Sequence, residues 1–209
     1  MPPIGTAVMT PDDTIDTPLL MIGCGILQKE IRFLIEKNGW PVTAVFLPSG
    51  LHTDFGKLQQ TLVKSLEAHS GKHRVVFYGA CHPLMDQILA AAATVRTPGQ
   101  NCVDIYLGHA AFCRDLEAGA FFLFEDWALH WDSIVGGEQG LAPPVMREIF
   151  RTAHTHLLAV RTPCSGDFSS QAERISVCTS LELRWVDVGL EHLEQTLKST
   201  ITSAMKEAA

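Results

Sequence analysis

The chain has 209 residues, of which 46% are apolar, and its formal net charge is −7. This length and apolar content suffice for one domain with a sizeable core, and the negative charge with scattered Lys and Arg argues against nucleic acid as a partner. No stretch of about twenty apolar residues could span a bilayer, and the first residues lack the pattern of a secretory signal, so we expect a cytoplasmic protein with no membrane partner. Because thiols stay reduced in that compartment, the six cysteines are expected to be core residues, ligands or nucleophiles.

The first half of the chain alternates between strand and helix patterns. Residues 1–16 are rich in Pro, Thr and Asp, which predicts a flexible N-terminal arm before a single α/β domain over 17–209. Apolar runs predict strands at 18–25, 41–50 and 73–81, and helical patterns predict helices at 26–40, 55–69 and 83–95. In the second helix Leu58, Leu62 and Leu66 recur every four residues, the spacing of a stripe packed on a sheet. Strands this continuously apolar favour a parallel sheet covered on both faces.

The second half is less regular but uses the same elements. It predicts a short strand or buried turn at 120–127, a helix at 143–152, a strand at 156–164, a helix at 166–178, an edge strand at 181–189 and a helix at 190–206. Residues 130–144 form the longest irregular insertion and a candidate lid. The predicted architecture is a three-layer α/β/α domain with a mainly parallel, Rossmann-like sheet of about five strands.

Potential metal ligands follow several of the predicted strands. Ligands of open parallel sheets bind at the carboxyl ends of the strands. Cys24 follows the first strand, His52 the second and Cys81 the third, and Cys164 follows a later strand, so we expect all four at the same edge of one sheet. Cys102 begins an apolar segment, and periodicity does not place it at that edge.

These residues allow more than one interpretation. A single cysteine is more often a core residue than a ligand, but Cys24 and Cys81 both stand beside small residues at strand ends, which favours ligands. A nucleophilic dyad of Cys81 with His52 or His82 is the alternative. The Gly-Cys-Gly at 23–25 lacks the third glycine of a dinucleotide fingerprint, so NAD is not expected.

Five motifs identify a family resemblance. "GCGILQKEI", "LPSGLH", "FYGAC", "NCVDIYLG" and "FFLFEDW", in this order, resemble the prokaryotic family catalogued as domain of unknown function 1638 (DUF1638), from about Leu20 to the C-terminal helix. The family pattern has a Cys-Gly after the first strand, a Leu-His after the second, a Gly-x-Cys-Gly after the third and a further Cys before the fourth element. Position by position, the resemblance implies a ligand set of Cys24, His52, Cys81 and Cys102. The chain departs from the pattern at His82, where the family usually has glycine.

The resemblance also implies a metabolic setting, because family members often sit beside genes for corrinoid-dependent methyl transfer. Three thiolates and one imidazole would satisfy tetrahedral zinc, with iron as the alternative metal. If His52 binds the metal the site is closed, and if it does not, a fourth position is open for water or a thiol. The first hypothesis is therefore zinc-thiolate methyl transfer to or from a thiol, a tetrahydrofolate or a corrinoid, with a corrinoid protein as a candidate partner. The alternatives are a metal-dependent hydrolase and a non-catalytic accessory protein that binds a metal, a corrinoid or a methyltransferase.

Further residues are candidates for catalysis or cofactor contact. The predicted catalytic residues are Cys81, His52 and Asp126, and the predicted cofactor-binding residues are Gly23, Gly25, Gly79, Gly108 and His109. A lone His or Asp near an apolar run is more often a helix cap or a hydrogen-bonded core residue, an alternative that applies to His109, Asp126, Asp104 and Arg161. The residues 108–112 and 126–140 are expected to line the pocket over the metal.

Overall fold

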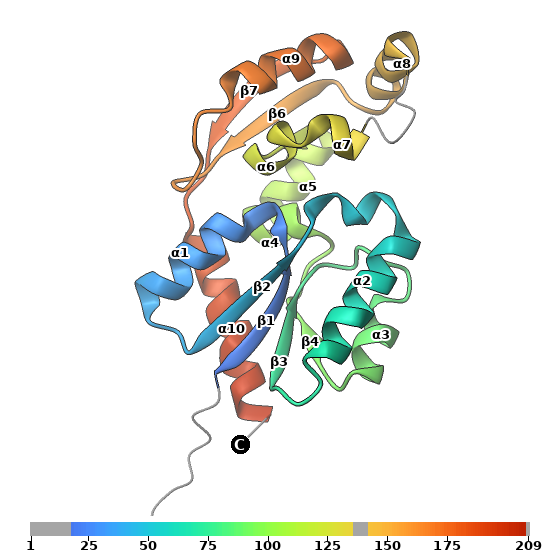
Figure 1. The fold of residues 1–209 in the computed structure, drawn as a ribbon. Helices are drawn as coiled ribbons and strands as arrows, with labels where there is room; N and C mark the ends of the chain where they lie inside the picture. The colour runs from blue at the N-terminus through green and yellow to red at the C-terminus, as the bar shows by residue number, and fades with distance from the viewer. Residues whose placement is uncertain (1–17, 136–141, 208–209) are drawn as a thin grey trace, which may run out of the picture.

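The first half of the chain forms a parallel sheet. We describe the fold from a computed structural model, which covers residues 18–135 and 142–207. The first sheet has the strand order β2-β1-β3-β4, and all its neighbours pair in parallel (Figure 1). Its strands are β1 (Leu19–Cys24), β2 (Val42–Leu47), β3 (Arg74–Phe77) and β4 (Val95–Arg96). The predicted N-terminal arm and residues 136–141 of the predicted lid lie outside the described residues.

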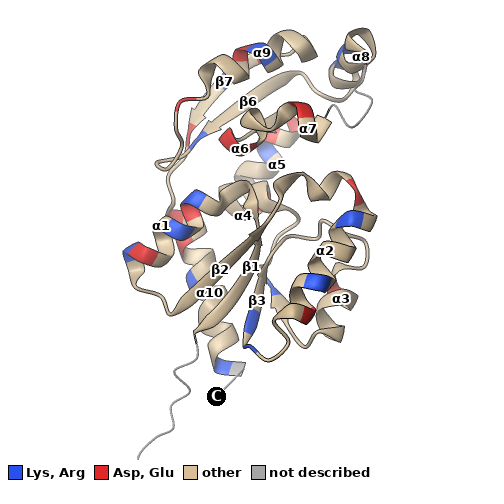
Figure 2. Ribbon diagram, in the orientation of Figure 1, with Lys and Arg blue, Asp and Glu red and all other residues tan. Residues whose placement is uncertain are grey.

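Helices cover both faces of this sheet. Helices α1 (Gln28–Asn38) and α10 (Glu191–Glu207) lie on one face, and α2 (Phe55–Ala68) and α3 (Met85–Ala91) lie on the other (Figure 1). The predicted stripe on α2 is buried: Leu58 and Leu62 are 0% exposed and Leu66 is 2% exposed. Acidic and basic residues alternate along α1, which therefore presents no face of a single charge (Figure 2). The predicted class, an α/β protein with parallel strands between helical layers, is confirmed.

The second half of the chain forms a separate sheet. Its parallel strands follow the order β5-β6-β7, with β5 (Ala120–Leu123), β6 (His156–Arg161) and β7 (Glu182–Asp187). The prediction of one sheet of about five strands is therefore wrong. Strand β4 is two residues long. Pro98 and Gly99 lie two and three residues after its end, and the φ of Gly99 is +136°. A strand this short ends the first sheet, and the chain then leaves it through two helices.

The remaining helices connect the two sheets or pack beside the second one. They are α4 (Cys102–Leu107), α5 (His109–Glu117), α6 (Glu125–Leu129), α7 (Trp131–Val135), α8 (Pro143–Ala153) and α9 (Ser169–Thr179). The predicted helices at 143–152, 166–178 and 190–206 are confirmed as α8, α9 and α10, and β7 lies at a sheet edge as predicted. Among the described residues, no helix is both long and apolar enough to cross a membrane.

The two sheets share buried contacts. Helix α10 follows β7 in the chain but packs on β3 and α4 of the first half (Figure 1). One continuous hydrophobic cluster contains Val76 of β3 together with Val160 of β6. The expectation of a single domain over 17–209 stays a prediction, and this shared core is the observation that favours it.

A buried carboxyl group also joins the two halves. Glu30 on α1 is 5% exposed. The hydroxyl of Thr162, which follows β6, donates a hydrogen bond of 2.6 Å to Glu30 Oε1. Burial raises the pKa of Glu30, and the hydrogen bond from Thr162 opposes that rise only in part.

Replacing Glu30 should change how stability depends on pH. The pKa of Glu30 in the folded protein lies above its ordinary value of 4.5, so the unfolded chain releases this proton first as the pH rises. The contribution of Glu30 to stability is therefore present below about pH 4.5 and is lost as the pH rises toward the folded-state pKa. We expect Glu30→Gln to remove this loss. Between pH 4.5 and 7, the free energy of unfolding of the wild type should therefore fall relative to that of the variant.

Urea denaturation at both pH values measures the effect. Glu36→Gln, an exposed position on the same helix, is the matched control and should keep the wild-type pH dependence. An identical pH dependence in the wild type and Glu30→Gln would contradict the expectation.

Candidate functional site

The predicted ligands follow the strands of the first sheet. The chain passes from β1 to β2 on one side and then to β3 on the other, so the strand order reverses between the carboxyl ends of β1 and β3. Ligand sites of open α/β sheets form at such a reversal. Cys24 is the last residue of β1, and Cys81 follows β3. His52 lies in the 3-10 turn η2 (Ser49–Thr53) after β2, and Cys102 begins α4 after β4.

The three thiols interact with one another. Cys24 and Cys102 are 5% and 7% exposed, and Cys81 is half-buried. Hydrogen bonding with Cys24 and with Cys81 raises the pKa of the Cys102 thiol, and burial adds to the rise. The hydrogen bond with Cys102 lowers the pKa of Cys81, against the effect of burial. The structure therefore brings Cys24, Cys81 and Cys102 together with Cys102 as the shared neighbour.

A cavity of about 490 Å³ lies next to these thiols, and we call it the thiol cavity. Its volume is in the range of small-molecule sites. Residues from both halves of the chain line it, and none of them is Lys, Arg, Asp or Glu. They are Cys24, Ile26, His52, Tyr78, Ala80, Cys81, Gln100, Asn101, Cys102, Val103, Phe112, Leu116, Ala120, Phe121, Phe122, Trp127 and His154.

His52 is held with one ring nitrogen available. Its Nδ1 lies 2.8 Å from the backbone oxygen of Ser49. Because a carbonyl oxygen can only accept, Nδ1 carries a proton, and in a neutral imidazole Nε2 then has the lone pair. The ring stacks on Trp127 with 4.8 Å between centroids and 13° between planes. Metal-binding histidines commonly have their second ring nitrogen held in this way.

The donor residues have the chemistry of a metal site but not its arrangement. Within residues 18–135 and 142–207, no group of three or more His, Cys, Asp or Glu side chains is arranged to hold a metal ion. Three thiols and a free imidazole nitrogen nevertheless have the chemistry that zinc and iron prefer. A cysteine side chain turns about a single torsion, so a bound metal would require the thiols to rotate toward one point.

Two polar groups of the lining are left without partners. In the described part of the chain, the Tyr78 hydroxyl and the Trp127 indole nitrogen are buried side-chain atoms that make no hydrogen bond. The sequence analysis singled out neither residue, although Trp127 lies in the segment 126–140 that was predicted to line the pocket. Tyr78 lies in the predicted strand 73–81, and Trp127 ends the predicted strand or buried turn at 120–127, so neither pattern separates them from the core.

Comparison with known proteins assigns the family. Residues 46–197 match the family described as "Protein of unknown function (DUF1638)". The chain belongs to the DUF1638 family. His52, Cys81 and Cys102 lie inside the DUF1638 match, and Cys24 precedes it. A search of curated proteins finds no match.

One solved structure is similar to this DUF1638 chain. It is a Xanthomonas campestris pv. campestris protein presumed to be a hydrolase of the alpha/beta superfamily, with 12% identity and a TM-score of 0.27 over 90% of this chain and 93% of the other. A TM-score this low does not establish a common fold.

Gly79 explains how the thiols of this DUF1638 member meet. A Cβ atom at Gly79 would lie 2.5 Å from the backbone of Asn101, so only glycine lets the loop after β3 touch the segment before α4. The side chain of Asn101 accepts a hydrogen bond of 2.9 Å from the backbone N–H of Asp104 and caps α4. This contact places Cys81 beside Cys102. Gly79, which was predicted to bind a cofactor, therefore has a packing role.

Other predicted cofactor-binding residues lie away from the thiol cavity. A Cβ at Gly23 would contact Phe46 and Phe77 on the neighbouring strands at 3.3 Å. Gly108 has a φ of +82° and joins α4 to α5. His109 is exposed, and its Nδ1 lies 3.2 Å from Asp104 Oδ1. Neither Gly108 nor His109 lines the cavity, although the predicted segments 108–112 and 126–140 do contribute Phe112 and Trp127 to its lining.

Cys164 and His82 lie outside the thiol cavity. The prediction that Cys164 shares an edge with Cys24 is wrong, because Cys164 follows β6 of the second sheet. His82 is 7% exposed. Its Nδ1 accepts a hydrogen bond of 3.0 Å from the backbone N–H of Leu84. The imidazole of His82 therefore stabilises the turn into α3, and it is not among the groups that line the thiol cavity.

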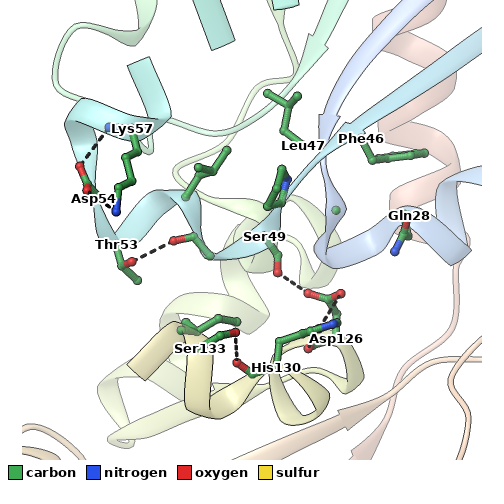
Figure 3. A pocket seen from close by; sticks show the side chains of 15 residues that line it. Gln28, Phe46, Leu47, Ser49, Thr53, Asp54, Lys57, Asp126, His130 and Ser133 are labelled. Carbon is green, nitrogen blue, oxygen red and sulfur yellow. Dashed lines mark hydrogen bonds and ion pairs between the residues drawn. The ribbon is translucent and has the colours of Figure 1, made fainter. Parts of the chain in front are cut away.

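Asp126 lies in a second, polar pocket of about 510 Å³ (Figure 3). Gly25 also lines this pocket, whereas Cys24 and Trp127, their neighbours in the chain, line the thiol cavity. The Ser49 hydroxyl donates to Asp126 Oδ2 (Figure 3). His130 Nδ1 lies 2.8 Å from the backbone oxygen of Asp126 and 3.5 Å from its Oδ1. Ser49 and His130 therefore both contact Asp126. The structure does not bring Asp126, a predicted catalytic residue, to the thiols.

Substituting Gly79 should disturb the loop contact. We expect Gly79→Ala to lower the free energy of unfolding by about 1–3 kcal/mol, because the new methyl group must displace backbone atoms. Gly71→Ala is the matched control, since a Cβ at Gly71 meets nothing within 4 Å. Urea denaturation of both variants measures the difference, and equal stability of the two would show that the loops are not in tight contact.

Proposed function

We propose that the thiol cavity is a metal-thiolate site that transfers a methyl group to or from a small molecule in one-carbon metabolism. The observation that carries the proposal is the arrangement of Cys24 at the end of β1, Cys81 after β3 and Cys102 at the start of α4 around one cavity at the reversal of strand order. A single buried cysteine is commonly a core residue, but three thiols beside one cavity are the donors that a soft metal ion prefers.

The residues present fit a soft metal ion by their chemistry. Cys24, Cys81 and Cys102 would hold zinc, or iron as the alternative, and His52 Nε2 is the candidate fourth ligand. When bound, zinc would lower the pKa of a thiol or a water at a fourth position that His52 leaves open. This open position is the condition for catalysis, because a fourth protein ligand would close the site.

The surroundings of the thiols suit methyl transfer. Phe121, Phe122 and Trp127 line the cavity, and aromatic walls of this kind exclude water from a reactive sulfur and a methyl donor. Transfer of a methyl group between sulfur and another nucleophile needs no carboxylate as acid or base, and none lines the cavity. Hydrolysis would use a histidine of the lining as general base. A metal-dependent hydrolase is the weaker proposal because thiolate ligands leave more negative charge on a bound sulfur and so favour its attack on a methyl group. A thiol, a tetrahydrofolate or a corrinoid, free or on a corrinoid protein, would be the methyl donor or acceptor.

A non-catalytic accessory role is the second candidate. Cys24 and Cys102 are 5% and 7% exposed, and with His52 as a ligand they would form the closed coordination typical of structural zinc. In that case the protein would bind a metal, a corrinoid or a methyltransferase partner without turnover.

Metal content is the first test of the proposal. Freshly purified protein should hold close to one zinc per chain, or iron if assembled without oxygen, because three thiolates bind such ions tightly. Replacing Cys24, Cys81 or Cys102 by Ser should each remove most of the metal, as measured by elemental analysis. Cys178→Ser, on α9 of the second half, is the matched control and should retain it. Full retention in all three site variants would end the metal hypothesis.

Methyl transfer is the second test. Incubation with methylcobalamin and thiol or folate acceptors should give a protein-dependent change in the corrinoid spectrum, because the methyl group leaves cobalt for the acceptor. The change should disappear in Cys81→Ser and persist in Cys178→Ser. Binding of a corrinoid protein without demethylation would instead favour the accessory role.

A further inference from the structure

The thiol cavity contains two hydrogen-bond donors that the protein does not satisfy. Tyr78 is 1% exposed, and its hydroxyl has no partner. The indole nitrogen of Trp127 is buried and also has no partner. Both residues line the cavity. Buried donors are nearly always paired, and an unpaired one destabilises the folded state, so two in one cavity indicate a missing acceptor.

Tyr78 lies beside the three cysteines. It directly follows β3, in the loop that carries Cys81, and it belongs to the same buried cluster as Cys24 and Cys102. All four residues line the thiol cavity. An acceptor bound to this hydroxyl would therefore stand next to the proposed metal-binding thiols.

Trp127 is held in place from two sides. Its ring stacks on His52, with centroids 4.8 Å apart, and contacts Phe121, with centroids 6.3 Å apart. A donor fixed in this way loses little conformational entropy when it binds an acceptor. The indole N–H is thus preorganised for a ligand.

The lining also limits the charge of that ligand. No Lys, Arg, Asp or Glu lines the cavity, and transfer of an unpaired ion from water into such surroundings is strongly unfavourable. Two histidines line it. Burial lowers the pKa of His154, which favours its neutral form. The lining therefore offers no fixed counter-charge to an ionic ligand.

We propose that the thiol cavity binds a small, neutral molecule with a carbonyl-type acceptor, which receives hydrogen bonds from Tyr78 Oη and Trp127 Nε1. The apolar body of the molecule packs against Phe112, Phe121 and Phe122. The inference rests on the proposed function for its setting, and it specifies that the part of the methyl donor or acceptor that enters the cavity is neutral and carries a carbonyl-type acceptor.

Four probes of similar size test the predicted chemistry. Acetophenone offers a neutral carbonyl, ethylbenzene has the same shape without an acceptor, and benzoate and benzylammonium carry opposite charges. Binding to the full chain is measured by ligand-observed NMR titration, with and without added zinc. Acetophenone should bind about tenfold more tightly than each of the others, the factor expected for a hydrogen bond to a buried donor. Equal or tighter binding of ethylbenzene or of either ion would overturn the proposal.

Substitutions at the two donors test whether each one binds the ligand. Tyr78→Phe should weaken acetophenone binding about tenfold and leave ethylbenzene binding unchanged, and Trp127→Phe should act in the same direction. Tyr106→Phe is the matched control, because the Tyr106 hydroxyl donates to the Val188 carbonyl at 2.8 Å and Tyr106 does not line the cavity. Undiminished acetophenone binding by Tyr78→Phe would refute the role of its hydroxyl.

A stability measurement gives an independent readout. Without ligand, Tyr78→Phe should raise the melting temperature because it removes an unpaired buried hydroxyl, whereas Tyr106→Phe should lower it by breaking a hydrogen bond. A lower melting temperature for Tyr78→Phe would show that its hydroxyl has a partner in the free protein, and it would count against the proposal.

The outcomes separate this inference from the proposed function. If the cysteine variants keep their metal while acetophenone remains preferred, the metal proposal fails and the ligand class stands. If the cysteine variants lose their metal and acetophenone shows no preference, the ligand class alone fails.

Discussion

The backbone contact between Gly79 and Asn101 determines how the cysteines meet. Cys81 follows one of the touching segments and Cys102 follows the other, so the approach of the two backbones fixes the separation of the two thiols. Cys24 reaches the same place because β1 lies next to β3 in the sheet. A side chain at Gly79 could not be accommodated without moving the backbone. A site assembled from distant parts of the sequence thus depends on one position without a Cβ atom.

The side chains that line the thiol cavity are not those that would make the fold most stable. It contains three thiols, together with a tyrosine hydroxyl and an indole N–H that lack the pairing usual in protein cores. Natural proteins tolerate such groups where binding or chemistry requires them, and other parts of the fold offset their cost. Here the two fully buried faces of β1 and the leucine stripe of α2 provide that stability. The cavity is therefore the part of the molecule whose composition packing does not explain.

The sequence predicts the elements better than their assembly. Continuous apolar runs and the spacing of Leu58, Leu62 and Leu66 identify strands and helices, because each pattern reflects local geometry. Strand ends also bring Cys24, His52 and Cys81 to one edge, since parallel strands end on the same side. The division into two sheets was missed because β4 is only two residues long, and no periodicity can be recognised in two residues.

Cys102 shows a different limit of sequence analysis. Only the family resemblance assigned it to the site, although Asn101 before it and Asp104 after it form a helix-start signal that would have placed it at the beginning of a helix. Tyr78 and Trp127 carry no such signal. An unpaired donor is a property of the assembled cavity, and it can be recognised only when all the neighbours are known.

The return of α10 to the first sheet has a consequence for biosynthesis. Its buried side chains, among them Leu193, Leu197 and Ile201, complete a core whose strands β1 to β3 are made much earlier. A ribosome must synthesise the entire second sheet before this cover exists, so until α10 emerges the growing chain exposes the part of the first sheet that α10 covers. Folding of the first sheet therefore cannot be completed before the second sheet has been made.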